Sequence, residues 1–506
     1  MNTNVLSYLE HSAASFPEKY ALVDETCRLT YRDVLHLSRR IETGLSHLVL
    51  PKRGVGVYME KTAQTLCVFF GAVYAGCFYS ALNTELPASR LVQIASVLEP
   101  GIIVTTRALA ADAREIFKGF TIVTVEELEQ TEPDLPRLEV LRQRSVDTDP
   151  LYINFTSGST GVPKGIVVAH RSVLDFIGCF TQIFNITGND VIANQAPFDF
   201  DVSVKDIYSA LAVGATLVVI PRWLFSAPAQ LADFLCEHHT TTMIWAVSAI
   251  CLLTTFHALD YRTPDTVNKI LFSGEVMPFR ALKDLKKHLP EAMLVNLYGP
   301  TEITCNCTYH ILEAQRDYSG GIPIGKPFPN EDVFLLDNEN RQIMQPDIPG
   351  EICVRGTALA LGYYRNPEQN AAHFVQNPLN PFYPEIIYRT GDLGRYNELG
   401  ELVFSGRKDF QIKYMGHRIE LEEIEREMAD IPGVERCCCI FDEKRSRLKG
   451  FYIGALSKDE LHSAMKAKLP DFMIPGILRQ VEEMPLTKNG KIDRKALDAL
   501  AGGRGK

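Results

Sequence analysis

A glycine-rich segment at residues 156–165, TSGSTGVPKG, has the composition of a phosphate-binding loop. It places three glycines, four hydroxyl side chains and one lysine, Lys164, in ten positions. Glycines let the backbone turn its N–H groups towards an anion, and hydroxyls and a lysine add donors and positive charge. It is not a Walker loop, because Lys164 follows a proline and Gly165 stands where a magnesium-binding hydroxyl would be. We therefore expect this loop to contact phosphate groups in some other way.

Further polar motifs follow the loop in a fixed order. They are YGPTE at 298–302, YRTGD at 388–392, GRKDFQIKYMGHRIE at 406–420 and PLTKNGKIDRKAL at 485–497. Taken alone, the GPTE segment would indicate only a turn with a solvated Glu302. Asp392 lies in a TGD turn, where an aspartate either binds a ligand hydroxyl or caps its own backbone.

The elements that must position these motifs alternate between helix and strand. Apolar runs at 151–155, 216–220, 242–246, 269–272 and 293–297 predict buried strands of an α/β architecture with a mostly parallel sheet. A polar stretch at 126–149 predicts a linker or loop. From residue 350 the segments GEICVRG and GELVFSGR indicate shorter, antiparallel strands, and about the last 95 residues mix two helices with strands, as in a small α+β domain.

Composition narrows the function classes. A chain of 506 residues predicts two or three domains. The net charge of −10 argues against nucleic acid as the main partner, because binding its phosphates needs a basic surface. No apolar run is long enough to span a membrane, and the N-terminus has no signal-peptide pattern. The twelve cysteines include no CxxC pair, so we expect reduced thiols and a cytoplasmic location.

Together, the five motifs resemble those of the adenylate-forming (AMP-binding) enzymes, which include acyl-CoA synthetases, luciferases and nonribosomal-peptide adenylation domains. The resemblance covers nearly the whole chain. It implies an α/β fold with a large N-terminal domain of αβ-layered sheets plus a β-rich subdomain, and a small mobile α+β C-terminal domain. The N-terminal domain would be residues 1–408, and residues 409–506 would carry the catalytic lysine.

The resemblance also implies an ATP-dependent activation of a carboxylic acid, with Mg²⁺ as the metal. Catalytic roles fall to Lys491, Glu302 and Lys164, with Glu302 also binding the metal. The implied ATP-binding residues are Thr156, Ser157, Gly158, Ser159, Thr160, Gly161, Gly274, Glu275, Val276, Asn296, Leu297, Tyr298, Gly299, Pro300, Thr301, Asp392 and Arg407. Tyr298 would stack on adenine, and Asp392 with Arg407 would bind the ribose. Asp409 falls at the hinge position, and residues 413–418 match the segment that swings in for the second half-reaction.

The segment APFDFDVSVKDIY at 196–208 is similar to the amino-acid-activating branch, in which an aspartate pairs with the substrate's α-ammonium group. Asp201 matches that aspartate, with Asp199 as a rival. LFSGEVMP at 271–278 adds a likeness to free-standing D-alanine–carrier-protein ligases. The substrate positions carried over are Asp201, Val202, Lys205, Ala246, Leu271, Ser273, Leu297, Cys305 and Asn306.

Departures from that pattern make D-alanine itself a poor match. Lys205 replaces an apolar residue, Ser273 replaces a cysteine, and Cys305 with Asn306 is more polar than the small-residue wall of those ligases. If Lys205 points inward, a polar or acidic substrate side chain is favoured. If Lys205 extends to solvent, it says nothing about the substrate. We therefore expect a small or polar amino acid.

Few residues follow the last motif, so we expect the thiol acceptor to be a separate phosphopantetheinylated carrier protein, or CoA. Two alternatives remain at this stage. One is an acyl-CoA-type ligase for a non-amino carboxylic acid, which would not need Asp201. The other is a nucleotide-binding regulatory protein without catalysis, against which Lys491, Glu302 and the phosphate loop argue.

Overall fold

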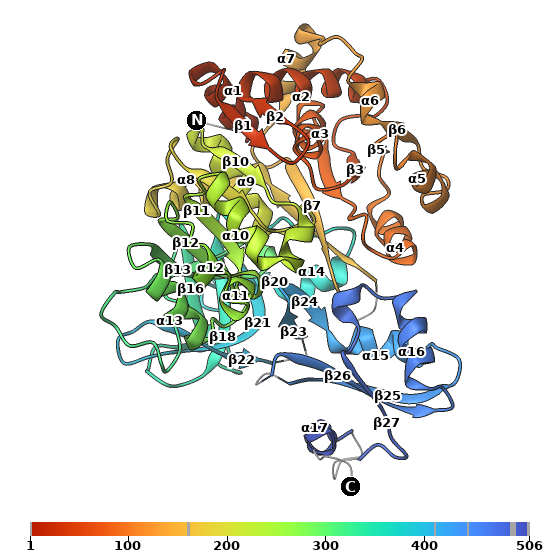
Figure 1. The fold of residues 1–506 in the computed structure, drawn as a ribbon, viewed down its shortest axis with the longest axis vertical. Helices are drawn as coiled ribbons and strands as arrows, with labels where there is room; N and C mark the ends of the chain where they lie inside the picture. The colour runs from red at the N-terminus through yellow and green to blue at the C-terminus, as the bar shows by residue number, and fades with distance from the viewer. Residues whose placement is uncertain (1–2, 159–161, 409–410, 443–444, 486–491, 503–506) are drawn as a thin grey trace. The chain divides into compact units, whose positions relative to one another are not determined.

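The computed structural model describes residues 3–158, 162–408, 411–442, 445–485 and 492–502. The chain divides into two compact units (Figure 1). The first consists of residues 1–84, 97–155 and 165–408, and the second of residues 85–96, 156–164 and 409–506. Across the described ranges, no helix is long and apolar enough to cross a membrane.

The first unit contains a nine-stranded sheet with the order β15-β14-β13-β12-β11-β9-β10-β1-β2. Its strands are β1 (Tyr20–Val23), β2 (Arg28–Thr30), β9 (Val191–Asn194), β10 (Thr216–Val219), β11 (Thr242–Ala246), β12 (Lys269–Ser273), β13 (Met293–Tyr298), β14 (Thr308–Ile311) and β15 (Lys326–Pro327). Six neighbouring strands of this sheet, β13, β12, β11, β9, β10 and β1, pair in parallel. Strand β2 at one edge and strands β14 and β15 at the other pair antiparallel. The apolar runs of β11 and β12 are buried throughout, as expected for parallel strands covered on both faces.

A seven-stranded sheet, ordered β19-β8-β7-β4-β3-β5-β6, is largely parallel as well. It contains β3 (Gly54–Tyr58), β4 (Phe78–Ala81), β5 (Ile102–Thr105), β6 (Ile122–Thr124), β7 (Pro150–Thr156), β8 (Lys164–Ala169) and β19 (Gly362–Tyr363). Strands β7 and β8 flank the glycine-rich loop, so the strand predicted before that loop is confirmed.

The third sheet is antiparallel, as the change of pattern after residue 350 predicted. Its strands are β16 (Glu331–Leu336), β17 (Gln342–Ile343), β18 (Gly350–Gly356), β20 (Phe374–Gln376), β21 (Ile386–Tyr396) and β22 (Leu402–Arg407). Strand β21 pairs with β18, β20 and β22, so it is the centre of this sheet.

Helices alternate with these strands along the chain. Those of the first unit are α1 (Leu6–Ser15), α2 (Tyr31–Ser46), α3 (Ala63–Tyr74), α5 (Ala110–Ile116), α6 (Val125–Leu128), α7 (Leu135–Arg144), α8 (His170–Ile183), α9 (Val202–Val213), α10 (Pro228–Glu237), α11 (Val247–Thr255), α12 (Ala258–Tyr261), α13 (Phe279–His288) and α14 (Pro367–His373). Helix α4 (Ala88–Leu98) falls largely within the second unit. Helix α9 lies between the sheets: Tyr208 hydrogen-bonds Tyr79 of β4 (Oη–Oη 3.0 Å), and Asp206 accepts a hydrogen bond from Asn194 of β9 (2.7 Å).

The prediction of a loop at residues 126–149 is wrong, because α6 ends and α7 lies within this stretch. The side chain of Asp134 accepts a hydrogen bond from the Arg137 N–H (3.1 Å) and caps α7, and a proline occupies its first turn. Leu138 is buried. Helix α7 also carries Leu135 and Val140, but these side chains are exposed. Its apolar residues therefore do not form one buried stripe with helical spacing, which explains the error.

The second unit has the α+β composition expected of the last 95 residues. It contains β23 (Gln411–Tyr414), β24 (His417–Glu420), α15 (Leu421–Ala429), β25 (Val434–Asp442), β26 (Arg447–Gly454), α16 (Lys458–Lys466), β27 (Ile477–Gln480) and α17 (Arg494–Gly502). Helix α15 packs on β25, and both contribute to a separate core with α16 (Figure 1). The run of three cysteines lies in β25, as predicted from its apolar neighbours.

Candidate active site

The carboxyl ends of neighbouring parallel strands bring several predicted substrate positions together. Ala246 ends β11 and is the register partner of Ser273, which ends β12. Ser273 is the register partner of Leu297 on β13. All three residues are buried, as is Leu271 two positions before Ser273. The carboxyl edge of an open α/β sheet is where such folds bind ligands.

The turn after β13 adds Cys305 and Asn306 to this edge. Thr304 and Cys305 have φ values of 51° and 77°, a left-handed conformation that is uncommon outside glycine. The Cys307 N–H donates to the Tyr298 carbonyl (2.8 Å), which closes the turn. Gly299 makes the approach possible, because a Cβ there would lie 2.5 Å from Asn306 Cα. The short range from 299 to 307 thus folds back on itself tightly.

The two rival aspartates at the start of α9 have different surroundings. Asp199 accepts two hydrogen bonds from Asn83 Nδ2 (3.2 and 3.3 Å), and burial raises its pKa. Asp201 immediately precedes α9, is 7% exposed and accepts a hydrogen bond from Cys305 Sγ at its carbonyl (3.1 Å). Val202, the next predicted position, is also buried. Asp201 therefore lies beside the turn that carries the other predicted positions, whereas Asp199 is held by Asn83.

The structure decides the direction of Lys205, which the sequence left open. Lys205 is 1% exposed. Its Nζ donates to Asn306 Oδ1 (2.8 Å) and to Ser273 Oγ (3.3 Å). We call Lys205, Ser273 and Asn306 the Lys205 cluster. It joins α9, β12 and the turn after β13, so the alternative of a lysine extending to solvent is excluded.

Glu302 lies in a short 3₁₀ turn, Thr301–Ile303, that follows β13. It is 1% exposed, its Oε1 accepts a hydrogen bond from Tyr363 Oη (2.7 Å), and its carbonyl accepts one from the Ala360 N–H (2.8 Å). No group of three or more His, Cys, Asp or Glu side chains that would cage a metal occurs among the described residues. A single carboxylate fits Mg²⁺ that arrives on nucleotide phosphates, because this ion keeps several waters and uses few protein ligands.

Tyr298, Asp392 and Arg407 form a second polar group. Tyr298 Oη donates to Asp392 Oδ2 (2.6 Å), and the Arg407 guanidinium donates to Asp392 Oδ1. Burial and the nearby charge of Asp392 hold the pKa of Tyr298 well above its usual range. The Asp392 N–H donates to Thr390 Oγ1 (3.0 Å), so the TGD turn is also braced locally. The residues predicted to bind ribose and adenine are therefore in contact with one another.

The other predicted nucleotide positions lie at the ends of β12 and β13. Asn296 donates from Nδ2 to the Pro323 carbonyl (2.9 Å). Gly274 has a φ of 96°, which favours glycine. Val276 is 72% exposed, Glu275 is half-buried, and Pro300 and Thr301 are buried. The predicted positions Pro300 and Thr301, which follow β13, are therefore buried, whereas Val276, in the loop after β12, is exposed.

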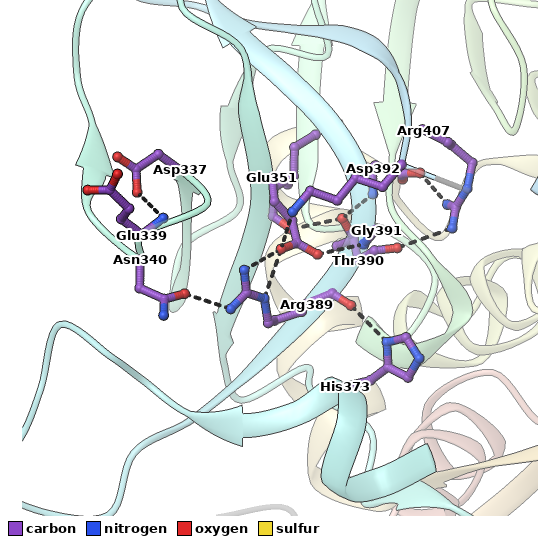
Figure 2. Close-up of polar contacts among 12 residues, drawn as sticks. Asp337, Glu339, Asn340, Glu351, His373, Arg389, Thr390, Gly391, Asp392 and Arg407 are labelled. Atoms are coloured by element: carbon purple, nitrogen blue, oxygen red, sulfur yellow. Dashed lines mark hydrogen bonds and ion pairs between the residues drawn. The ribbon is translucent and has the colours of Figure 1, made fainter. Parts of the chain in front are cut away.

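Figure 2 shows a network beneath the TGD turn, with Glu351 of β18 at its centre. Glu351 Oε2 accepts from Arg389 Nε (2.8 Å) and Lys408 Nζ (3.1 Å), and its Oε1 accepts from the Gly391 N–H (3.2 Å). Burial alone would raise the pKa of Glu351, but the hydrogen bonds and charges of Arg389 and Lys408 hold it below its usual range. The carboxylate thus fixes the turn that presents Asp392.

In the second unit, the described part of the glycine-rich loop lies against β24. Ser157 Oγ donates to the Arg418 carbonyl (2.7 Å). Lys164 Nζ lies 3.9 Å from Glu420 Oε1, and 9% and 10% of the two side chains are exposed. A Cβ on Gly158 would lie 2.3 Å from the Val162 carbonyl oxygen, so only glycine fits there. The charge of the loop lysine is thus matched within this unit by a carboxylate.

Some predicted residues lie outside the part of the chain that the structure describes. They are Ser159, Thr160 and Gly161 of the loop, the hinge candidate Asp409, and Lys491. Thr156, the first loop residue, ends β7.

Sequence reasoning missed Tyr363, Glu351, Asn83 and Glu420, which position the predicted residues. Glu420 closes the motif at 406–420, so its charge was a visible signal that received no role. Tyr363 lies 61 positions from Glu302, and no local pattern indicates such a contact.

Comparison with known proteins agrees with this geometry. The family model of the AMP-binding enzymes matches residues 9–364, and that of their C-terminal domain matches residues 423–491. The chain therefore belongs to the AMP-binding enzyme family. It is an adenylate-forming ligase of the type found in nonribosomal peptide synthesis, which confirms the resemblance noted in the motifs.

Relatives of two sizes support this assignment. The chain is 33% identical to bacitracin synthase 1 of Bacillus licheniformis over 504 residues, which is 96% of this chain but 9% of that protein. It is 30% identical to the zwittermicin A synthase ZmaJ of Bacillus cereus over 514 residues, covering 99% and 95% of the two chains. The structure of holo-PA1221, described as an NRPS protein containing adenylation and PCP domains, matches with a TM-score of 0.82 and 26% identity over 98% of this chain and 84% of that one. The expected α/β fold with a large N-terminal and a smaller C-terminal domain is thereby confirmed.

Replacing Gly299 by alanine tests the close approach in the turn after β13. The added Cβ would meet backbone atoms of residues 305–307, which cannot rotate away. We expect Gly299→Ala to lower the free energy of unfolding by about 1–3 kcal/mol, measured by urea denaturation. Gly178→Ala is the control, because a Cβ on this α8 residue meets nothing within 4 Å. Equal stability of the two variants would contradict the argument.

Replacing Glu351 by glutamine tests the network of Figure 2. Because the pKa of Glu351 is depressed in the folded protein, its contribution is present above the usual glutamate pKa of about 4.3 and is lost as the pH falls through the folded value. We expect Glu351→Gln to lower the free energy of unfolding by about 2 kcal/mol at neutral pH, and by less as the pH falls below about 4. The exposed Glu339→Gln is the control. A deficit that does not vary with pH would show that ionisation of Glu351 is irrelevant.

Proposed function

We propose that this enzyme activates a small or polar amino acid as its aminoacyl-AMP, releases pyrophosphate, and transfers the aminoacyl group to the phosphopantetheine thiol of a separate carrier protein. The observation that carries the proposal is the buried Asp201 beside the turn of Cys305 at the carboxyl edge of the sheet. Asp201 matches the aspartate that, in the amino-acid-activating branch, pairs with the substrate's α-ammonium group, and a carboxylate in a buried site interacts strongly with such a cation. A carboxylic acid without an α-amine would form no ion pair with Asp201.

In the first half-reaction, an oxygen of the substrate carboxylate bonds to the α-phosphorus, and the bond from that phosphorus to the β-phosphate bridging oxygen breaks. Asp392 would accept hydrogen bonds from the ribose hydroxyls, with Arg407 holding its other oxygen. Tyr298, held by Asp392, would present its ring to adenine. Lys164 and the loop residues 156–161 would bind the β- and γ-phosphates, and positioning of this kind supplies much of the rate.

Glu302 would hold the metal, with Tyr363 fixing the carboxylate through its hydroxyl. Mg²⁺ bound with ATP neutralises charge on the phosphate oxygens. Lys491 would stabilise the negative charge that develops between the substrate carboxylate and the α-phosphate. Each of these residues binds, orients or stabilises the substrate carboxylate and ATP, and none of them forms a covalent bond in the reaction.

We further propose that residues 1–408 form the adenylating core and residues 409–506 a mobile domain that carries Lys491, with Asp409 as the hinge. The two compact units, whose largest parts end and begin at Lys408 and Asp409, support this division. In the second half-reaction, the carrier thiol attacks the acyl carbon and AMP leaves. The carrier partner is supported by the similarity to PA1221, an NRPS protein described as containing adenylation and PCP domains. We place the enzyme in the cytoplasm, because an ATP-dependent reaction and cysteines that form no disulfides fit that compartment.

ATP–pyrophosphate exchange tests the amino-acid assignment. With L- and D-amino acids and a few fatty and aryl acids as substrates, we expect exchange with one or a few amino acids. Asp201→Asn should lower kcat/KM for that amino acid about 100-fold or more, because the buried α-ammonium loses its ionic partner. Asp199→Asn is the matched control, since Asn83 already holds Asp199, and it should have a much smaller effect.

Other outcomes of this experiment have defined meanings. Exchange only with acids that lack an α-amine would replace the proposal by an acyl-CoA-type ligase. If Asp201→Asn leaves the exchange activity unchanged, Asp201 does not bind the substrate. Adding a separate phosphopantetheinylated carrier, or CoA, to the adenylating enzyme then shows which thiol is acylated.

Lys491→Ala tests the proposed catalytic lysine. Because its charge would act in the transition state, we expect exchange to fall by about 100-fold or more while the thermal unfolding midpoint stays unchanged. Lys488→Ala, three positions earlier in the same motif, is the control and should retain most of the activity. Near-normal exchange in Lys491→Ala would refute the role.

A further inference from the structure

Residues 357–361 join β18 to β19, and we call them the β18–β19 segment. The Ala360 N–H donates to the Glu302 carbonyl (2.8 Å), and Tyr363 Oη, at the end of β19, donates to Glu302 Oε1 (2.7 Å). The segment and the strand that follows it therefore hold both the backbone and the carboxylate of Glu302. A shift of the segment would shift that carboxylate as well.

Glu331 contacts this segment through its side chain. It is the first residue of β16 and the register partner of Gly356, the last residue of β18. Its Oε1 accepts a hydrogen bond from the Ala358 N–H (3.0 Å). The Ala358 carbonyl in turn accepts one from Oγ1 of Thr304 (2.7 Å), which lies two positions after Glu302. Ala358 therefore connects the carboxyl group of Glu331 to the turn of Glu302.

The surroundings of the Glu331 carboxyl group favour its neutral form. Its Oε2 is buried and has no hydrogen-bond partner among the described residues. Asp175 of α8 acts on Glu331 with a charge of the same sign. Asp175 also accepts a hydrogen bond from Asn330, the residue before Glu331 (2.9 Å). A negative charge on a buried oxygen without a donor is costly, and the second carboxyl group adds repulsion.

The pKa values agree with this geometry. Burial is the largest cause that raises the pKa of Glu331 to about 8; the hydrogen bond from Ala358 lowers it, and the charge of Asp175 raises it further. Burial also raises the pKa values of Cys179 on α8 and of Tyr8 on α1, the latter to about 12. The thiol and the phenol are therefore neutral and bring no charge to the pair of carboxyl groups.

The arginine on the neighbouring strand β18 is engaged by other carboxylates. Asp332 follows Glu331, so its side chain points to the other face of the sheet. There it accepts a hydrogen bond from Arg355 Nε (2.9 Å), and Arg355 Nη1 donates to Glu385 (2.6 Å). The guanidinium of Arg355 is thus held by two carboxylates on the face away from Glu331.

We propose that Glu331, as a neutral carboxylic acid, is a positioning residue for Glu302, which it holds through Ala358 and the β18–β19 segment. The inference rests on the proposed role of Glu302 in binding Mg²⁺ with ATP. When the pH rises and Glu331 loses its proton, its carboxylate is stabilised by moving towards solvent and away from Asp175. That movement breaks the hydrogen bond with Ala358, so the segment no longer fixes Glu302. The affinity for Mg·ATP then falls at alkaline pH.

Two substitutions separate the hydrogen bond from the ionisation. Glu331→Gln keeps an acceptor oxygen for the Ala358 N–H and cannot ionise, whereas Glu331→Ala removes the acceptor. ATP–pyrophosphate exchange with the best amino-acid substrate is measured at about pH 6.5 and about pH 9, on either side of the Glu331 pKa. At the lower pH, we expect KM for Mg·ATP to rise about 10-fold in Glu331→Ala, with a smaller change in kcat, and to stay within about 2-fold in Glu331→Gln. At the higher pH, KM of the wild type should exceed that of Glu331→Gln by about 5-fold or more.

The thermal unfolding midpoint, measured without ATP or metal, gives a second readout. Because the pKa of Glu331 in the folded protein lies above the usual glutamate value of about 4.3, the folded state holds the proton more tightly than the unfolded chain. The stability of the wild type therefore falls relative to Glu331→Gln as the pH rises from about 4.3 to about 8, and the difference is constant above that range. We expect similar midpoints at about pH 4 and a higher midpoint for Glu331→Gln at about pH 9. Glu339→Gln, which replaces an exposed glutamate, is the control and should show no gain at alkaline pH.

Each contrary result has its own meaning. Identical pH profiles of wild type and Glu331→Gln would overturn the inference, and so would a difference in unfolding midpoint without any difference in KM for Mg·ATP. If Glu331→Ala fails to fold, as judged by circular dichroism, the comparison with Glu331→Gln decides. If no carboxylic acid supports exchange, the proposed function fails. The affinity for Mg·ATP, measured by isothermal titration calorimetry on the same proteins at both pH values, then decides the role of Glu331.

Discussion

Helix α9 is buried along most of its length although it carries Lys205 and Asp206. Buried charged groups persist only where other groups satisfy them, and here the partners come from separate parts of the chain. Asn194 extends from β9, Ser273 from β12, and Asn306 from the turn after β13. The position of the helix and the positions of the strand ends therefore depend on one another. The proposed amino-acid site lies where α9 contacts the end of β12 and the turn after β13.

A second polar contact joins two sheets of the first unit. Tyr298, at the end of β13 in the nine-stranded sheet, donates to Asp392 on β21 of the antiparallel sheet. Arg407 and the network around Glu351 hold Asp392 from the other side (Figure 2). Tyr298, Asp392 and Arg407 are thus held by contacts with one another. Preorganised donors and acceptors of this kind avoid the cost of reorganisation when the reaction occurs.

Much of the architecture was visible in the sequence. The apolar runs of β10 to β13 were long enough and sufficiently bounded to predict strands within one or two residues of their observed ends. Helix α7 was missed because it buries little apolar surface, and its signals are a capping aspartate and an early proline. The motifs predicted which polar residues belong to the site, but they carried no information on Tyr363 or Asn83, which hold Glu302 and Asp199 from distant positions.

By itself, the sequence determined the family, the order of the motifs and the identity of the chemical groups, because these depend on residue type and local spacing. The tertiary structure decided that Lys205 points inward, that Asp199 is held by Asn83 while Asp201 lies beside Cys305, and that Glu420 faces the loop lysine. These features arise from contacts between residues far apart in the chain. The direction of a side chain is set by the free energy of burying it against such partners, and hydrophobic periodicity does not encode those partners.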